Sequence, residues 1–261
     1  MKHPILLIAS TFLFSATLVS CPIISAEKTI VQAQEANLNS ADAYYNRGIS
    51  YAQQGKYELA IADFSQAIEI DPNYADGYLN RGNSYAAQDK TALAIADYSQ
   101  ALKIDPNYAD AYYNRGNSYA AQDKNALAIA DYSQALKIDP NYAIAYYNRG
   151  VIYAQQGKNA LAITDFNQAI EINPNYADAY NNRGISYRKQ GKDELAIADY
   201  SQALKIDPNY VKAYFNRAVI YAKQGKYELA RTDLEKVKQL FLAKGDAASA
   251  EEVDRTLREL P

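Results

Sequence analysis

The stretch ADAYYNRGNSYAAQDKNALAIADYSQALKIDPNY, residues 109–142, decides the fold because the chain repeats it. Residues 75–107 and 109–141 differ at only three positions. More divergent copies occupy residues 41–74, 143–176, 177–210 and 211–244, and all six copies align without a gap at a length of 34 residues. A period of this length predicts an array of stacked units rather than one globular domain.

Each unit has the pattern of two antiparallel helices. Places are counted from the first residue of a unit. Asp-Pro or Asn-Pro ends the second helix, because the residue before proline is disfavoured in helical conformation. An Asn followed three residues later by Asp, as in Asn107 and Asp110, predicts a capped start of the first helix. Gly or Asp at place fifteen predicts the turn between the helices, because both tolerate left-handed backbone. These turn residues are Gly55, Asp89, Asp123, Gly157, Gly191 and Gly225.

Units one to five share Tyr, Gly and Tyr at places four, eight and eleven, and Ala, an aromatic residue, Ala and Pro at places twenty, twenty-four, twenty-seven and thirty-two. In residues 109–142 these are Tyr112, Gly116, Tyr119, Ala128, Tyr132, Ala135 and Pro140. This pattern resembles the tetratricopeptide repeat (TPR) over about 205 of 261 residues. The resemblance implies an all-α fold, a right-handed α-solenoid of six helix-turn-helix units. Arginine at place seven departs from the leucine that the family usually has. The sixth unit has Ala218 in place of the glycine and lacks the terminal proline.

Two further segments precede the array and one follows it. Residues 1–20 place one lysine before an apolar run of about sixteen residues, which predicts a signal peptide. We interpret residues 21–39 as a tether and residues 40–244 as the six repeats. Residues 245–261 are predicted to contain a capping helix, because a stripe of apolar residues at helical spacing would cover the last unit. That stripe is Ala250, Val253, Leu257 and Leu260, and a docking helix for a partner is the alternative.

The predicted leader ends in Leu18-Val19-Ser20-Cys21. This sequence resembles the bacterial lipobox, which implies cleavage before a lipidated Cys21 and a protein anchored by its acyl chains. Pro22 is unusual after a lipidated cysteine, and cleavage after Ala26 would instead release a soluble protein. An uncleaved leader that acts as an anchor is a third alternative. We therefore expect export, either to the bacterial periplasm or to a lipid-anchored position in the cell envelope.

The composition argues against several classes of function. The net charge is −3, or −4 without Lys2, so the chain lacks the excess positive charge that binds nucleic acid or an anionic membrane surface. The only histidine is His3 and the only cysteine is Cys21, so the repeats contain no imidazole base, no thiol nucleophile and no Cys/His zinc cluster. We expect no cofactor, no metal site and no enzymatic activity, with a carboxylate-based enzyme as the least favoured alternative.

Asn and Arg recur together at places six and seven of every unit. At about 100° per residue, place seven shares the packed side of the first helix with places four, eight and eleven. A guanidinium on a packed face needs a partner, and place twenty-three is Asp in all six units. We therefore predict structural ion pairs, within a unit or between units; binding of an anionic ligand is the alternative. The residues are Arg47, Arg81, Arg115, Arg149, Arg183 and Arg217 with Asp63, Asp97, Asp131, Asp165, Asp199 and Asp233.

Place six lies on the opposite side of the helix, which in this family is the concave wall. Some family members have asparagines here that bind the backbone of an extended peptide, and a carboxamide offers both a donor and an acceptor. The resemblance thus implies a peptide-binding groove with aromatic residues at place five; solvated asparagines without a binding role are the alternative. The groove residues are Asn46, Asn80, Asn114, Asn148, Asn182, Asn216, Tyr45, Tyr113, Tyr147 and Phe215.

Charge along this face predicts a preferred direction for a bound segment. Its acidic residues come early and its basic residues late in the chain. They are Asp42, Asp76 and Asp110, followed by Arg188, Lys189, Lys212 and Lys223. The family's pattern of lysines at places two and five, which grips terminal carboxylates, is not reproduced, because those places are mostly Asp and Tyr.

The expected partner is a protein or peptide in extended conformation, without nucleic acid, and with membrane contact only through the leader or a lipid. Envelope lipoproteins of this repeat class assemble pili, outer-membrane proteins or wall hydrolases, so the resemblance implies a scaffold for envelope assembly. Self-association is the alternative, with residues 27–39 or the capping helix of one molecule in the groove of another. The sequence leaves the oligomeric state open.

Overall fold

The computed structural model describes residues 39–261, so the predicted leader, Cys21 and nearly all of the predicted tether lie outside the described residues. The described residues form thirteen α-helices and no strand. The six units are α2 (Ala41–Gln53) with α3 (Tyr57–Ile70), α4 (Ala75–Ala86) with α5 (Thr91–Ile104), α6 (Ala109–Ala120) with α7 (Asn125–Ile138), α8 (Ala143–Gln155) with α9 (Asn159–Ile172), α10 (Ala177–Lys189) with α11 (Asp193–Ile206), and α12 (Val211–Lys223) with α13 (Tyr227–Ala243). α14 (Ala247–Glu259) follows the sixth unit.

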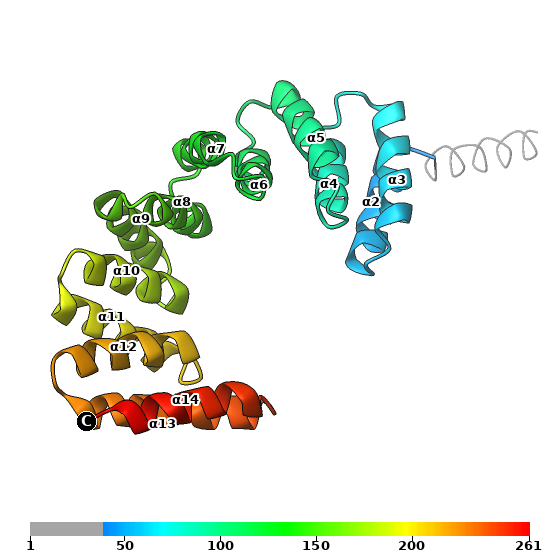
Figure 1. The fold of residues 1–261 in the computed structure, drawn as a ribbon. Helices are drawn as coiled ribbons and strands as arrows, with labels where there is room; N and C mark the ends of the chain where they lie inside the picture. Colours follow the sequence, from blue (N-terminus) through cyan, green and yellow to red (C-terminus); the bar gives the residue numbers. More distant parts are fainter. Residues whose placement is uncertain (1–38) are drawn as a thin grey trace, which may run out of the picture.

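The units stack into an arc (Figure 1). Each first helix packs on the second helix of its own unit, and each second helix packs on the first helix of the next unit. First helices of neighbouring units also touch, as α2 does with α4 and α10 with α12. In Figure 1 the first helices α4, α6 and α8 lie on the inner side of the arc. The predicted all-α solenoid is therefore confirmed, and we call the inner face formed by the first helices the concave groove.

The turn inside each unit has the predicted left-handed residue. Gly55 has φ of 72° and Asp89 has φ of 58°, and the other four turn residues fall between 56° and 75°. The predicted caps are wrong, because the first helices of units two to six have no side-chain cap. Asn107 instead donates its backbone N–H to Asp105 Oδ1 (2.9 Å) in the loop before α6. Asp110 is bound by a tyrosine hydroxyl, so its carboxylate is engaged elsewhere.

The core of each unit depends on the glycine at place eight. A Cβ at Gly116 would lie 2.8 Å from Cε1 of the buried Tyr132 ring, so glycine lets the two helices approach closely. The sixth unit differs at both places, since Ala218 stands where the other units have glycine and Leu234 stands where they have an aromatic ring. The smaller side chain at place twenty-four accommodates the extra methyl group, and both residues are buried.

α14 packs against α13 at the end of the array. Val253 is buried against Leu234 and Val237, with Leu257 beside it. The side chain of Asp246 caps the helix by accepting a hydrogen bond from the Ser249 N–H (3.0 Å). α14 thus covers the apolar face that α13 would otherwise expose. None of the helices in residues 39–261 combines the length and the apolar character required for a membrane crossing.

Candidate functional site

The arginines at place seven face the interior of each unit. Arg115 Nε and Nη2 donate to the two carboxylate oxygens of Asp131 at 2.7 and 2.8 Å, and Nη1 donates to Ser99 Oγ of the preceding unit at 3.1 Å. Its guanidinium also lies over the Tyr112 ring, 5.6 Å from the centroid. The hydrogen bond to Asp131 raises the pKa of Arg115 above its usual value. The arginine is therefore permanently charged, and each of its three guanidinium nitrogens donates a hydrogen bond to a protein group.

The same arrangement recurs in every unit. The pairs are Arg47 with Asp63, Arg81 with Asp97, Arg115 with Asp131, Arg149 with Asp165, Arg183 with Asp199, and Arg217 with Asp233. Sequence reasoning left open whether partners come from the same unit or from a neighbour. The structure places each aspartate in the arginine's own unit, and each of the five inner arginines also bonds a Ser or Asn of the unit before it. Arg47, with no unit before it, is 55% exposed along its side chain, against 18–19% for the others.

The asparagines at place six lie on the concave side, but their amide groups are not all available. Asn80 donates both amide hydrogens inside the protein, to Tyr45 Oη (3.1 Å) and to the Asp76 carbonyl (3.0 Å). Asn148 donates to Tyr113 Oη (3.2 Å) and to Asn117 Oδ1 (3.1 Å). The expectation that each carboxamide offers both a donor and an acceptor is therefore wrong for these two residues.

Three of the remaining asparagines also donate a hydrogen bond to a residue of the preceding unit. Asn114 donates to Asn83 Oδ1 (3.0 Å), Asn182 to Tyr147 Oη (2.9 Å), and Asn216 to Asn181 Oδ1 (3.0 Å). Asn46, in the first unit, makes no side-chain hydrogen bond with the described residues. Within residues 39–261, the side-chain Oδ1 atoms at place six in units two, three, four and six accept no hydrogen bond, so these asparagines present a row of acceptors.

The tyrosines at place five are packed rather than free. The Tyr45 ring lies 5.8 Å from Phe64 and 5.0 Å from Tyr74 between centroids, and the rings of Tyr113 and Tyr147 are packed alike. The three tyrosines are half-buried, so packing against these neighbours covers part of each ring. Their hydroxyl groups accept from the asparagines of the next unit and donate to no described residue. They supply the donors that the asparagines have lost.

The other three residues at place five differ from the tyrosines. Phe215 is 46% exposed, whereas Leu79 (6%) and Asn181 (2%) are buried. Phe215 is thus the most exposed of the four aromatic residues predicted for the groove.

The acidic residues of the groove are held by tyrosines at place thirty-four, which we call the seam tyrosines. Tyr74 donates its hydroxyl to Asp42 (2.9 Å) and Tyr142 donates to Asp110 (2.6 Å). Burial, followed by these hydrogen bonds, raises the pKa of both tyrosines. The Asp at place two and the Tyr at place thirty-four were visible in the sequence, but their contact across 32 residues was not predicted. In the fourth unit Ile144 stands in place of the aspartate.

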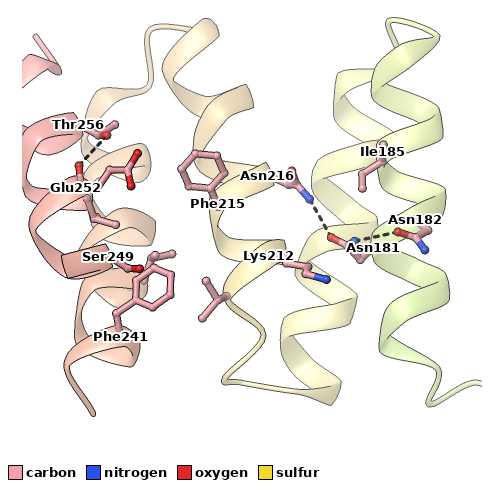
Figure 2. Close-up of a pocket in the computed structure, with 13 residues that line it drawn as sticks. Asn181, Asn182, Ile185, Lys212, Phe215, Asn216, Phe241, Ser249, Glu252 and Thr256 are labelled. Carbon is pink, nitrogen blue, oxygen red and sulfur yellow. Dashed lines mark hydrogen bonds between the residues drawn. The ribbon is translucent and has the colours of Figure 1, made fainter. Parts of the chain in front are cut away.

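A pocket of about 600 Å³ opens at the C-terminal end of the groove, between α10, α12, α13 and α14 (Figure 2). It contains two of the predicted groove asparagines and Phe215. Its lining residues are Asn181, Asn182, Ile185, Val211, Lys212, Phe215, Asn216, Val237, Phe241, Ser249, Glu252, Val253 and Thr256. Asn148 and Asn114 line two smaller hollows, of about 290 and about 280 Å³, further along the array. Sequence reasoning missed the part of this site that α13 and α14 contribute.

Comparison with known proteins identifies the repeat. Family profiles described as "TPR repeat" match residues 82–123, 116–157, 152–191 and 184–225. Profiles described as "Tetratricopeptide repeat" match residues 41–74, 64–96 and 211–242. The chain belongs to the tetratricopeptide repeat family. The TPR match extends through all six units and stops before α14. No curated protein matches the chain significantly in sequence.

Solved TPR structures resemble the array. MamA is 26% identical with a TM-score of 0.59, over 66% of this chain and 94% of MamA. YrrB, described as "a TPR protein with an unusual peptide-binding site", is 26% identical with a TM-score of 0.60, over 70% of this chain and 94% of YrrB. PilF of Pseudomonas aeruginosa is 20% identical with a TM-score of 0.69, over 81% of this chain and 96% of PilF, and supports the fold alone.

Proposed function

We propose that this TPR protein is a non-enzymatic protein-protein interaction scaffold that binds an extended polypeptide segment along the concave groove. The observation that carries the proposal is the row of asparagine carbonyl oxygens without partners in residues 39–261. Beside them stand the tyrosine hydroxyls that donate to no described residue. An extended backbone needs both kinds of group, because each residue presents one N–H donor and one C=O acceptor.

The spacing of the row suits an extended chain. Packed helices lie about 8–10 Å apart, and an extended chain rises about 3.3 Å per residue, so successive units meet about every third residue. Each hydrogen bond contributes about 0.5–1.5 kcal/mol net, so a full row barely exceeds the cost of association. A dissociation constant of about 1 μM, which corresponds to about −8 kcal/mol, therefore needs further contacts from the side chains beside the row.

The family relationship supports a binding role. Peptide binding is described for YrrB, which matches 70% of this chain, and the TPR fold is typically an interaction scaffold. The interior arginines and aspartates are engaged in ion pairs with each other, so these groups serve the packing of the units. We extend the proposal to the cell envelope on the strength of the predicted leader. Mass spectrometry of the mature amino terminus tests this extension, since a diacylglycerol adduct on Cys21 marks a lipoprotein.

Selection of peptides on the purified full chain tests the binding function. A random library of dodecamers displayed on phage is the probe, and single selected peptides are then measured by fluorescence anisotropy. The variant Asn114→Ala/Asn148→Ala removes two carbonyl acceptors of the row. We expect it to weaken binding about tenfold, because each lost hydrogen bond contributes about 0.5–1.5 kcal/mol.

The matched control is Asn107→Ala/Asn141→Ala. Both residues are exposed in the loops before α6 and α8, and their side chains make no hydrogen bond within residues 39–261, where only their backbone groups are bonded. Circular dichroism confirms that each variant keeps its helix content. Equal affinity of the wild type and the groove variant for every selected peptide would contradict the proposal.

Self-association remains the second candidate function, with one molecule occupying the groove of another. Light scattering across a concentration series separates the two. A monomer at every concentration would exclude self-assembly, whereas a growing species that the groove variant abolishes would favour it.

A further inference from the structure

Three departures from the repeat pattern meet at the C-terminal end of the groove. At place five, Asn181 replaces the tyrosine that units one, three and four carry. At the same place in the last unit stands Phe215. At place two, Lys212 replaces the aspartate of four other units. All three residues line the pocket between α12 and α14 (Figure 2).

The first two departures explain why a pocket exists there. In units one, three and four a tyrosine at place five fills the space against a seam tyrosine. Asn181 is shorter and lies buried, where it donates to Asn182 Oδ1 (3.2 Å) and accepts from Asn216. The sixth unit has Lys244 at place thirty-four, so no seam tyrosine covers Phe215. The space that aromatic rings fill elsewhere in the array is thus left open.

The walls of this space are mostly apolar. Phe215 is nearly half exposed, and Phe241 lies across from it in Figure 2. The apolar lining residues are Ile185, Val211, Phe215, Val237, Phe241 and Val253. A pocket of about 600 Å³ with apolar walls and a few polar groups suits a bulky apolar side chain. α14 contributes Ser249, Glu252, Val253 and Thr256, so this helix is a wall of the pocket as well as a cover for α13.

The third departure gives the pocket a charge preference. Lys212 is exposed and has no carboxylate within 4.0 Å among residues 39–261. It also lies in the first turn of α12, where the helix dipole disfavours a positive charge and favours a negative one. An incoming carboxylate would therefore be stabilised by the lysine and by the helix terminus together. Glu252 belongs to the α14 wall and disfavours an acidic group on that side.

We propose that this pocket selects, from extended polypeptides, segments that carry a bulky apolar side chain with an aspartate or glutamate beside it. The apolar side chain enters between Phe215 and Val253, and the carboxylate lies against Lys212. The inference rests on the proposed binding function and adds the chemistry of the segment. A dodecamer with its anchor in this pocket spans about 40 Å and reaches several units back along the asparagine row.

Two pocket variants and two matched controls test this inference on the full chain. Lys212→Glu reverses the free charge, and Phe215→Ala removes the open aromatic wall. The controls are Lys103→Glu and Leu195→Ala, which change an exposed lysine on α5 and a leucine on α11 that is 48% exposed. The probes are dodecamers selected from the random library, together with three designed dodecamers in a Ser/Gly background. These carry a central Phe-Asp, Phe-Lys or Ser-Asp pair.

We expect the selected peptides to share an apolar and acidic pair, and the Phe-Asp peptide to bind about tenfold more tightly than the Phe-Lys peptide. Lys212→Glu should reverse this preference, and Phe215→Ala should remove the advantage of Phe-Asp over Ser-Asp. Both controls should behave as the wild type. One contrary result is that peptides bind more weakly to Asn114→Ala/Asn148→Ala but lack the apolar and acidic pair. The other is that they bind more weakly to this groove variant but bind both pocket variants as tightly as the wild type. Either result overturns this inference and leaves the binding function in place. If no peptide is selected on the wild type, both fall.

Discussion

Replacement of Arg115 by leucine tests how the interior charges stabilise the array. The substitution restores the residue that the family usually has at place seven, and it removes two hydrogen bonds to Asp131 and one to Ser99. The side chain of Asp131 is only 9% exposed, so its carboxylate is left without its partner and nearly without water.

The magnitude follows from burial. Leaving one member of a buried ion pair uncompensated costs about 3–5 kcal/mol. The leucine side chain recovers about 1–2 kcal/mol by burying apolar surface at the same place. We therefore expect Arg115→Leu to lower the free energy of unfolding by about 1–4 kcal/mol. Arg47→Leu is the matched variant, because the Arg47 side chain is 55% exposed and water can reach Asp63 once it is removed. Its expected cost is about 0–1 kcal/mol.

Guanidinium unfolding of both variants, followed by circular dichroism, measures the difference. Because repeat arrays unfold as coupled units, the curves are fitted with nearest-neighbour coupling rather than as one transition. The double variant Arg115→Leu/Asp131→Ala should recover part of the loss, since no carboxylate then remains unpaired. Equal costs for Arg115→Leu and Arg47→Leu, or no cost for either, would refute the reasoning from burial.

Two further predictions concern packing and pH. Gly116→Ala should lower the free energy of unfolding, measured in guanidinium, by about 1–3 kcal/mol, because its methyl group would overlap the Tyr132 ring. Adding Tyr132→Leu should recover most of that loss, because it recreates the combination found in the sixth unit. A double variant as unstable as the summed single variants would contradict this prediction. The hydrogen bonds from Ser249 lower the pKa of Asp246 in the folded protein. The cap that Asp246 makes on α14 should therefore be present above the unfolded pKa of about 3.9, and it should be lost as the pH falls through the lower pKa of the folded state. The amide shift of Ser249, followed by NMR from about pH 6 to about pH 2, checks this, and a transition above the unfolded pKa would count against it.

Much of the architecture could be predicted from the chain alone because the repeat makes each unit's local rules visible six times. Place fifteen carries only Gly or Asp, and these residues do adopt left-handed backbone. Arginine on the packed side demanded an anion, and one aspartate was present at a fixed distance along the chain. Helical phase therefore sufficed to place the cation inside and the asparagine outside.

The fate of the asparagine side chains could not be predicted in the same way. Whether Asn148 reaches Tyr113 and Asn117 depends on how closely and at what angle consecutive units stack, and the period of the sequence does not contain that angle. Tyr113 therefore offers its hydroxyl group to a ligand, whereas Asn148 offers only its side-chain carbonyl oxygen.

The sequence by itself determined the number of units, their internal turns and the need of each arginine for an aspartate, because these depend on residues that recur in every unit. The tertiary structure decided that each aspartate comes from the arginine's own unit. Only the tertiary structure decided which amide atoms remain available and where a pocket opens. Both depend on contacts between hairpins, since Asn181 and Phe215 lie in different units and α14 closes the space beside them. Packing between units, rather than the pattern within them, thus determines the chemistry that the groove presents.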